Sequence, residues 1–517
     1  MPAPLLIAIP TGLTLGGVQV WAVRLLNTLA ARGHPCGLLL HPPREAALPM
    51  RLHEGIRTFF APEPLTSTPP LTDSPTLAAY REAVKTLHAL TGSPVVCVPT
   101  QLGDCAGLFA RLIAEDLPVR LTAWVHSDIP YEQRVLEFYR PVIRHAAAVS
   151  SDLVRASRAT LPEASIWHIP SAVPVSPARP RRLTARPRLI YAGRLCGDVK
   201  RVLALPAASR ELTHLGVHHE LTIVGDGPAA GELRRACAGL DSVSLLPPQA
   251  PDALAALYDD HDYFLLPSRV EGLSISLLEA MSRGCVPVST PTSGAADAIT
   301  PPDHEPAGLV VQATPDEEAE SVGVRLARAI AAAQDALPRM SRAAIDVVAA
   351  RFSLEQQANH AQRFIEAAAA APALRWPAHR DPRFTAPSPH GSGAVPPDGE
   401  RRLRELLASL AGRRLIIHGT GHHTRELLHV FEEHRASIAA FADDDPAARA
   451  ARLLDLPVID PADAALTRAT DVVISSRINQ ETIWRRRAVY ERQAIAVHRI
   501  YPLGAEMPAD EAAKLAR

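Results

Sequence analysis

The sequence predicts an α/β protein in which parallel sheets are covered by helices on both faces. Short apolar runs alternate with longer amphipathic segments along most of the chain, and this alternation is typical of βαβ units. The alternation weakens at two Pro-rich stretches, which divides the chain into three parts. A chain of 517 residues is also too long for one hydrophobic core. We therefore expect two doubly wound Rossmann-like domains and a smaller Rossmann-like domain after them.

The first domain is predicted to span residues 1–180. Strands are expected at short apolar runs, and helices where apolar residues recur with the helical period. Gly33 is expected to end the first helix, because glycine accepts the left-handed conformation found after helix ends. The predicted strands are Leu5–Ile9, Cys36–Leu40, Pro94–Val98 and Arg120–Val125, and the predicted helices are Val18–Arg32, Pro75–Thr91 and Tyr131–His145.

The second domain is predicted to span residues 181–370, with an interdomain hinge over the Pro- and Arg-rich stretch Pro170–Pro187. Residues 371–400 are rich in Pro, Gly and Ser without a hydrophobic period, which favours a linker. Strand–helix alternation returns from Arg414–His418, so residues 401–517 are predicted to form the accessory Rossmann-like domain. The predicted strands of the second domain are Arg188–Ala192, Glu220–Val224, Val243–Leu246, Tyr263–Leu266 and Cys285–Ser289.

Composition and charge exclude several classes of protein. Lys and Arg total 54 against 55 Asp and Glu, so there is no basic excess and no nucleic-acid partner is expected. The six cysteines form no C-x-x-C pair, which argues against a disulfide scaffold or a structural zinc site. No window holds about 18 uncharged apolar residues, and the first apolar run is too short for a signal peptide. We expect a cytoplasmic protein without a transmembrane segment, and peripheral contact with the inner face of the cell membrane stays open.

The strand ends of the second domain carry groups suited to a nucleotide sugar. Such a donor needs cations and backbone N–H groups for its diphosphate and a carboxylate for its ribose, and these gather at the carboxyl ends of parallel strands. Arg194 follows the first strand and Lys200 lies six residues beyond it, so two cations are expected near the diphosphate. Gly225 begins a tight Gly-Asp-Gly-Pro turn after the second strand.

Two glutamates frame the next motif. Glu271 precedes the stretch Gly272–Ser276, which is expected to begin a helix whose free N–H groups face an anion. Glu279 lies within that helix. The preceding strand ends in Pro-Ser, and a Gly-x-Pro-Val strand follows.

These motifs, taken in order, resemble the signature of retaining glycosyltransferase family 4, within glycosyltransferase group 1. A lone Glu-x7-Glu arises often by chance, whereas Gly-Arg-Leu…Lys, Gly-Asp-Gly-Pro, Pro-Ser…Glu-x7-Glu and Gly-x-Pro-Val in this order are specific. The resemblance covers about residues 1–370. It implies GT-B architecture, with two Rossmann-like domains facing a cleft and the appended C-terminal domain outside it.

The resemblance also implies an activity. A hexose-type sugar would pass from a nucleotide-diphosphate donor, a UDP- or GDP-sugar, to a hydroxyl acceptor with retention of configuration. The acceptor would dock on the first domain and could be a glycan, a lipid-linked molecule or a small metabolite. No cofactor and no metal are expected, because Arg and Lys take the metal's place and no Asp-x-Asp stands at a strand end.

Site residues carried over from the family fall on matching positions. Arg194 and Lys200 would neutralise the diphosphate, Glu279 would bind the ribose hydroxyls, and Glu271 would contact the transferred sugar. His126, at a predicted strand exit, takes the place of the family's active-site histidine. The predicted catalytic residues are therefore His126, Glu271, Arg194 and Lys200, and the predicted donor-binding residues are Gly16, Gly17, Arg194, Lys200, Gly225, Gly272, Leu273, Ser274 and Glu279.

Three positions depart from the family pattern. Ile169–Val173 replaces a Pro-Asn-Gly turn at the domain junction, and Arg201 replaces the glycine that usually follows the diphosphate lysine. The usual Gly-Gly-x-x-Glu is reduced to Ser-Gly-Ala-Ala-Asp, ending at Asp297. None of these changes removes a charged donor contact, so activity is still expected.

Each assignment has a purely structural alternative. Glu279 could be a surface carboxylate, and Glu271 an acid favoured by the helix dipole. Arg194 and Lys200 could form structural ion pairs. His126 could be a structural residue at a strand end, and the glycines at 16 and 17 could only make a tight turn.

The first strand of the accessory domain leads into Gly419-Thr420-Gly421. This stretch resembles a dinucleotide fingerprint whose third glycine is replaced by Thr424. Asp443 comes where the second strand should end, 22 residues after Gly421, so an acid there could meet a ribose. Gly419, Gly421 and Asp443 form a candidate accessory nucleotide site. A structural or docking module is the alternative. The histidines at 418, 422, 423 and 429 lack acid or Cys partners at ligand spacing, so no metal is expected.

Two rival functions stay open. A GT-B nucleotide-sugar epimerase or hydrolase would break the same bond without an acceptor. A catalytically decayed donor-binding scaffold would keep the fold and lose turnover.

Overall fold

The computed structural model describes residues 2–14, 16–43, 50–63, 74–100, 103–127, 129–175, 177, 180–197, 199–314, 317–378, 380–382, 399–421, 423–424, 427–444, 449, 452–476 and 480–501, without the side chains of 103, 104, 130, 131, 481, 482 and 485. The chain separates into two compact units, Met1–Thr385 and Ala386–Arg517. This boundary falls within the stretch 371–400 that the sequence predicts as a linker.

The first sheet of the first unit is wholly parallel and, within the described ranges, has the order β3-β2-β1-β4-β5. Its central strand β1 is completely buried, as expected for a strand covered on both faces. The elements are β1 Leu5–Ile9, α1 Gly17–Ala31, β2 Cys36–Leu40, β3 Ile56–Phe60, α2 Pro75–Thr91, β4 Val95–Pro99, α3 Gly103–Ala114 and β5 Val119–Leu121.

A second, three-stranded sheet of described residues follows, in the order β6-β7-β8. It shows that the prediction of one strand over Arg120–Val125 is wrong. The chain leaves the first sheet at Thr122, whose backbone N–H and hydroxyl both donate to the Cys97 carbonyl at 3.0 Å. The elements are β6 Ala123–Val125, α4 Pro130–Tyr139, the 3-10 turn η1 Arg140–Val142, β7 His145–Ala148, α5 Ser151–Thr160 and β8 Ser165–His168.

The predicted helix Tyr131–His145 is too long at its C-terminal end. Helix α4 ends at Tyr139, a short 3-10 turn follows, and His145 already begins β7. Pro141 contributes to this end, because it has no N–H to donate to the Glu137 carbonyl, while Arg140 before it keeps helical dihedral angles of φ −44° and ψ −39°.

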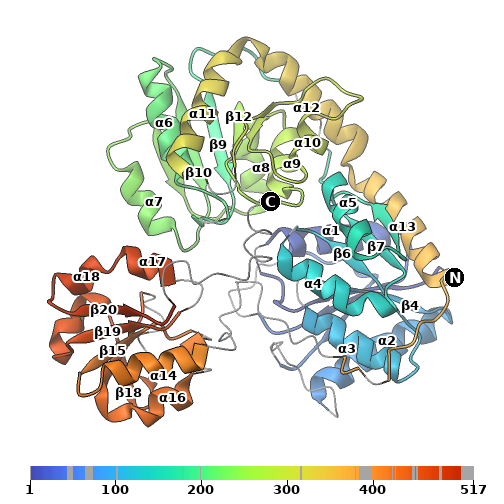
Figure 1. The fold of residues 1–517 in the computed structure, drawn as a ribbon. Helices are drawn as coiled ribbons and strands as arrows, with labels where there is room; N and C mark the ends of the chain where they lie inside the picture. Colours follow the sequence, from blue (N-terminus) through green and yellow to red (C-terminus); the bar gives the residue numbers. More distant parts are fainter. Residues whose placement is uncertain are drawn as a thin grey trace. The chain divides into compact units, whose positions relative to one another are not determined.

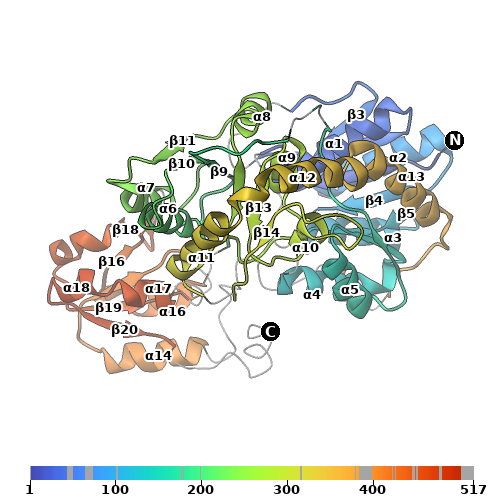
Figure 2. The ribbon, with the colours of Figure 1, turned by 90° about the horizontal axis from the view of Figure 1, so that it is seen from above.

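The second domain contains a parallel sheet that, in the part of the chain that is described, has the order β11-β10-β9-β12-β13-β14. Helices α6 and α11 pack against each other beside it (Figure 1; Figure 2). The elements are β9 Arg188–Ala192, α6 Ala204–His214, β10 Glu220–Val224, α7 Ala230–Cys237, β11 Val243–Leu246, α8 Pro251–Asp259, β12 Tyr263–Leu266, α9 Ile275–Ser282, β13 Val286–Ser289, α10 Ala295–Ile299, β14 Leu309–Val310, α11 Ala319–Ala332 and α12 Leu337–Arg351.

Helix α13, Leu354–Ala370, joins the second domain back to the first (Figure 1). It lies beside α1, and Phe364 packs edge-on against Trp124 and Trp167, with ring centroids 5.5 Å and 6.0 Å away. The two domains of the first unit are therefore tied together by the chain crossing twice between them.

The second unit contains a sheet that, among its described residues, has the order β17-β18-β16-β15-β19-β20, antiparallel only between β17 and β18. This is the predicted small Rossmann-like lobe. Its elements are α14 Gly399–Ser409, β15 Leu415–His418, α16 Leu428–Glu433, η3 Arg435–Ser437, β16 Ile438–Ala442, β17 Arg452–Leu453, β18 Leu456–Ile459, η5 Pro461–Thr467, β19 Asp471–Ile474, α17 Gln480–Arg485, α18 Ala488–Glu491 and β20 Ala496–Arg499.

None of the described helices is both long enough and apolar enough to pass through a bilayer.

Helix packing in the second domain gives a stability prediction. A Cβ atom at Gly323 of α11 would lie 2.3 Å from the Ala204 carbonyl oxygen at the start of α6. Gly323→Ala should therefore push the two helices apart and lower the free energy of unfolding by about 1–3 kcal/mol, the usual cost of overpacking.

Gly231→Ala in α7 is the matched control, since its Cβ would meet only Arg235 Nη1 at 3.8 Å. Helix propensity alone should then stabilise by up to about 1 kcal/mol. Denaturant unfolding of both variants checks the pair, and equal midpoints would contradict the packing argument.

Candidate functional site

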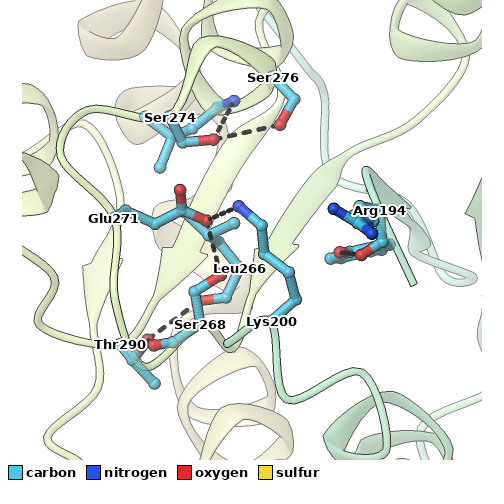
Figure 3. Close-up of polar contacts among 10 residues, drawn as sticks. Arg194, Lys200, Leu266, Ser268, Glu271, Ser274, Ser276 and Thr290 are labelled. Carbon is cyan, nitrogen blue, oxygen red and sulfur yellow. Dashed lines mark hydrogen bonds and ion pairs between the residues drawn. The ribbon is translucent and has the colours of Figure 1, made fainter. Parts of the chain in front are cut away.

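The loops after β9, β12 and β13 meet at the C-terminal ends of their strands in the sheet of the second domain (Figure 3). Lys200 and Glu271 form the closest pair there, with Nζ 2.5 Å from Oε1. The Ser268 hydroxyl donates to the same carboxylate oxygen at 2.8 Å. The side chains of Lys200 and Glu271 are only 25% and 11% exposed. The pair is thus partly withdrawn from water, where a charge-assisted bond is stronger than at the surface.

Three further hydrogen bonds hold the Glu271 loop in place. Thr290, just after β13, donates its hydroxyl to the Ser268 carbonyl at 2.5 Å and to the Leu266 carbonyl at 3.2 Å. The Arg269 N–H donates to the Val199 carbonyl at 2.8 Å, which joins this loop to the one carrying Lys200. The lysine–glutamate pair is therefore fixed from both sides.

Arg194 lies on the other side of Lys200 from Glu271 (Figure 3). It is exposed, and its guanidinium has no hydrogen bond or ion pair to any described residue. Its carbonyl accepts from the buried Tyr191 hydroxyl at 3.0 Å, so the backbone is anchored while the cation stays available. An unpaired cation next to a paired one is a suitable arrangement for an incoming diphosphate.

Gly225 lies close against the backbone of the loop that carries Arg194. Its φ of 148° is in the region that favours glycine, and a Cβ there would lie 2.0 Å from the Gly193 carbonyl oxygen. The Leu195 N–H donates to the Asp226 carbonyl at 2.8 Å. The predicted donor-binding glycine thus holds the Arg194 loop close to the end of β10.

The helix start predicted within the stretch Gly272–Ser276 is confirmed. Helix α9 begins at Ile275, with Ser274 as its N-cap and the Ser274 hydroxyl accepting from Leu277 N–H. Gly272 stays non-helical because it is enclosed by backbone: a Cβ there would lie 1.8 Å from the His126 carbonyl oxygen. Among the described residues, no acceptor receives the N–H groups of Gly272 and Leu273. These donors can meet an anion at the helix N-terminus.

Arg201 explains one departure from the family pattern. Its φ is 50°, in the left-handed region where glycine has no steric penalty and other residues do. The side chain is nevertheless 1% exposed and donates to the Thr314 carbonyl at 2.7 Å. A buried hydrogen bond therefore compensates for the unfavourable backbone conformation.

His126 meets this site through its backbone, while its imidazole packs 4.4 Å from the Trp21 ring. The imidazole Nε2 is shielded from solvent and has no hydrogen-bond partner in the described part of the chain. Burial lowers the pKa of His126 to about 3. The ring is therefore neutral at ordinary pH, so it can exchange a hydrogen bond and cannot act as a cation.

The predicted glycine loop of the first domain also reaches the second domain. Gly16 is the N-cap of α1, and the Gln19 side chain holds the loop by donating to Thr11 Oγ1 at 2.8 Å. A Cβ at Gly17 would lie 3.9 Å from Ile275 Cδ1 at the start of α9. Gly16 and Gly17 therefore lie next to the helix that carries Glu279.

Glu279 has a partner that sequence reasoning missed. Arg24 of α1 places Nη2 2.5 Å from Glu279 Oε1, and the two side chains are 19% and 22% exposed. Arg24 carries no sequence signal of its own beyond lying seven residues, or two helical turns, after Gly17. The structure thus brings a first-domain cation to the predicted ribose carboxylate.

The reduced motif ending at Asp297 contacts the first domain. Asp297 Oδ2 accepts from the Ser151 N–H at 2.6 Å, at the start of α5, and the hydroxyls of Ser293 and Ser150 lie 3.0 Å apart. A carboxylate at a helix N-terminus is stabilising. This motif therefore serves the contact between the two domains in the structure.

The accessory unit places its predicted residues around one loop. A Cβ at Gly419 would lie 2.6 Å from the Ser475 carbonyl oxygen, and nothing lies within 4 Å of one at Gly421. Asp443 Oδ2 accepts from Thr420, from the N–H at 2.9 Å and the hydroxyl at 2.6 Å. Asp443 is therefore engaged by the glycine loop, and its predicted contact with a ribose stays a prediction.

Thr424, which replaces the third glycine of the fingerprint, is fully buried. Its hydroxyl bonds to the Gly419 and Ser475 carbonyls, both at 2.8 Å. His422 lies outside the described residues. Within the described ranges, no three His, Cys, Asp or Glu residues are grouped so that they could hold a metal ion.

Comparison with known proteins tests the second domain directly. Residues 186–328 match the family model of glycosyl transferases group 1. This segment is similar to the glycosyltransferases of group 1. It contains Arg194, Lys200, Glu271 and Glu279, so the predicted resemblance to glycosyltransferase group 1 is confirmed for this segment, and the assignment to retaining family 4 stays a prediction.

Two curated relatives match a similar length of chain. Sulfoquinovosyl transferase SQD2 of Arabidopsis thaliana is 28% identical over 172 residues, 31% of this chain and 32% of that protein. The putative colanic acid biosynthesis glycosyltransferase WcaL of Salmonella typhimurium is 33% identical over 164 residues, 30% of this chain and 38% of that protein. The chain thus spans about a third of the length of the curated relatives that it matches.

Solved structures extend the likeness to the fold of both domains. Sucrose-phosphate synthase from Thermosynechococcus elongatus superimposes with a TM-score of 0.56 at 19% identity, covering 71% of this chain and all of that one. The pneumococcal O-GlcNAc transferase GtfA, solved with UDP and GlcNAc, gives 0.54 at 10% identity, covering 72% and 100%. The first unit therefore has the predicted GT-B fold.

Thiol reactivity can test the exposure of the Arg194–Lys200 loop. Cys196 is the partly exposed thiol of this loop, and the other cysteines (Cys36, Cys97, Cys105, Cys237 and Cys285) are buried. Burial raises the pKa of Cys36 and of Cys285 to about 12, so their reactive thiolate is scarce. Native protein should react quickly with one equivalent of Ellman's reagent, and Cys196→Ser should remove this fast phase. A fast phase that persists in Cys196→Ser would contradict the structure of the loop.

Proposed function

We propose that the protein transfers a hexose-type sugar from a nucleoside-diphosphate donor, a UDP- or GDP-sugar, to a hydroxyl acceptor with retention of configuration. The observation that carries the proposal is the group of charged side chains at the C-terminal ends of the strands in the sheet of the second domain. Arg194 is free of described partners, Lys200 is paired with Glu271 at 2.5 Å, and these residues lie in the segment that matches the group 1 family. The GT-B neighbour solved with UDP is consistent with such a donor.

The chemistry follows from where charge develops. As the bond between the sugar C1 and the diphosphate breaks, negative charge grows on the leaving oxygen. Arg194, Lys200 and the free N–H groups of Gly272 and Leu273 would face that charge, and preorganised donors of this kind usually contribute most to catalysis. The acceptor oxygen bonds to C1 on the same face, and its proton passes to the leaving phosphate.

Glu271 has two tasks in this scheme. In the unliganded site it compensates the charge of Lys200 and keeps the lysine positioned. With donor bound, Lys200 can turn towards the phosphate, and Glu271 would accept hydrogen bonds from sugar hydroxyls. Neutral His126 would lie on the opposite side, where it can exchange a hydrogen bond with the sugar.

Nucleotide binding should depend on Glu279. A ligand at about 100 times its dissociation constant stabilises the folded protein by roughly 2.7 kcal/mol. We expect UDP or GDP to raise the thermal midpoint selectively in a panel with ADP, CDP and NAD, and Glu279→Ala to remove the shift. Glu232→Ala, at an exposed position of α7, is the control and should keep the shift. A flat response to every nucleoside diphosphate would count against the transferase.

Turnover should depend on Glu271 more than binding does. Glu271→Gln removes the negative charge beside Lys200 and the sugar, so release of nucleoside diphosphate from the donor should fall by about 10²–10³-fold, the usual effect of losing one transition-state contact. Nucleotide binding should change only a few-fold. If the variant turned over donor at the wild-type rate, a binding scaffold or another catalytic group would have to be considered. An acceptor-independent release at full rate would favour the hydrolase alternative.

A further inference from the structure

We propose that Arg24 of the first domain is a positioning residue for the donor's ribose, acting through Glu279. This inference rests on the proposed function, because it assigns a new residue to the donor site described above. The glutamate carries the ribose contact, and the arginine decides which way its carboxylate faces.

The packing of two helices places Arg24 there. Gly17, at the first position of α1, lies beside Ile275, at the first position of α9. Arg24 is two turns further along α1, and Glu279 is one turn further along α9. The N-termini of the two helices therefore lie next to each other, and the long side chain of Arg24 reaches from α1 to Glu279.

The ion pair leaves half of the carboxylate available. Arg24 Nη2 is 2.5 Å from Glu279 Oε1, and no described residue bonds to the second oxygen, Oε2. Glu279 keeps 22% of its side chain exposed. A carboxylate oxygen accepts more than one hydrogen bond, so vicinal ribose hydroxyls could bind Oε2 while Arg24 stays on Oε1.

A neutral diol would not displace the arginine. Hydrogen bonds between charged partners are roughly twice as strong as neutral ones, and the pair is mostly shielded from water. Arg24 Nη1 is also buried without a hydrogen-bond partner among the described residues. A buried N–H without an acceptor is unfavourable, so Nη1 gives the guanidinium no second anchor, and its ion pair with Glu279 is the polar contact seen among the described residues.

Arg24 could alternatively serve only as a strut between the domains. The two roles differ in one measurable quantity, the discrimination between ribose and 2′-deoxyribose. A strut would change the affinity for both nucleotides equally. A positioning residue would change their ratio, since the orientation of Glu279 matters only when the 2′-hydroxyl is present.

The test uses the full chain and the nucleoside diphosphate that binds best in the thermal panel. Its dissociation constant and that of its 2′-deoxy analogue are measured by calorimetry for wild type, Arg24→Gln, Glu279→Gln and the double variant. Wild type should prefer the ribonucleotide by about tenfold or more. Arg24→Gln should reduce that preference to about threefold or less, and the double variant should be no worse than Glu279→Gln alone.

Arg32→Gln is the matched control. Arg32 follows the same helix and donates across to Asn359 and Gln362 of α13 at 2.8 and 3.1 Å, away from Glu279. It should leave the ribose preference unchanged. Circular dichroism and the unfolding midpoint of each variant separate loss of positioning from loss of folding.

The outcomes separate this inference from the proposed function. An unchanged ribose preference in Arg24→Gln, or a wild type that binds both nucleotides equally, overturns the role of Arg24 while the donor site stands. A proportional loss of affinity for both nucleotides also overturns it and leaves the strut. A wild type that binds no nucleoside diphosphate overturns both the inference and the proposed function.

Discussion

The close approach of the two domains at Gly272 is the constraint on which the candidate site depends. The residue is enclosed between the His126 carbonyl of the first domain and Gly294 of the second, whose own Cβ would lie 2.3 Å from the Gly272 carbonyl oxygen. No side chain fits between these backbones, so the chain crosses this point as glycine and only then turns into α9. That delay leaves the N–H groups of Gly272 and Leu273 outside the helix and without acceptors among the described residues. The same contact thus fixes the two domains against each other and leaves two donors for an anion.

Each of the two glutamates of the site forms an ion pair without any ligand, and the partner comes from a different domain in each case. Glu271 is paired with Lys200 of its own domain, and Glu279 with Arg24 of the other. Burying either carboxylate alone would be costly, and removing one partner of such a pair leaves an uncompensated charge. Three residues of the second domain are predicted to bind the diphosphate and the ribose, namely Arg194, Lys200 and Glu279. Of these, Arg194 is exposed and has no ion-pair partner among the described residues. Counting only these two pairs and Arg194, the cations outnumber the carboxylates by one, which favours a dianionic ligand although the chain as a whole is nearly neutral.

Much of the fold was predictable because buried parallel strands are apolar along their whole length. The bounds of β1, β2, β9, β10, β11 and β12 and of helix α2 agree with the predicted ones. Strand β3 was missed because its side chains are partly exposed, and the break between β5 and β6 because both are apolar. Within the site, motif spacing placed Arg194, Lys200 and Glu271 at the C-terminal ends of the strands of one sheet. The partner of Glu279 was not predictable, because Arg24 lies 255 residues away and only the packing of α1 on α9 brings them together.

Similarity to known proteins is distributed unevenly along the chain, and the different contributions of the two domains to the candidate site explain why. Sequence likeness to the curated relatives covers about 30% of the chain, whereas likeness of fold covers 71–72%. The segment with sequence likeness holds the cations and carboxylates whose chemistry a diphosphate donor would dictate, and those residue types have few substitutes. The described residues of the first domain contribute backbone at His126 and Gly17, which many sequences can supply, and the side chains of Arg24 and His126. A domain that acts mainly through its backbone is free to change its other side chains, which agrees with a likeness of fold that extends beyond the likeness of sequence.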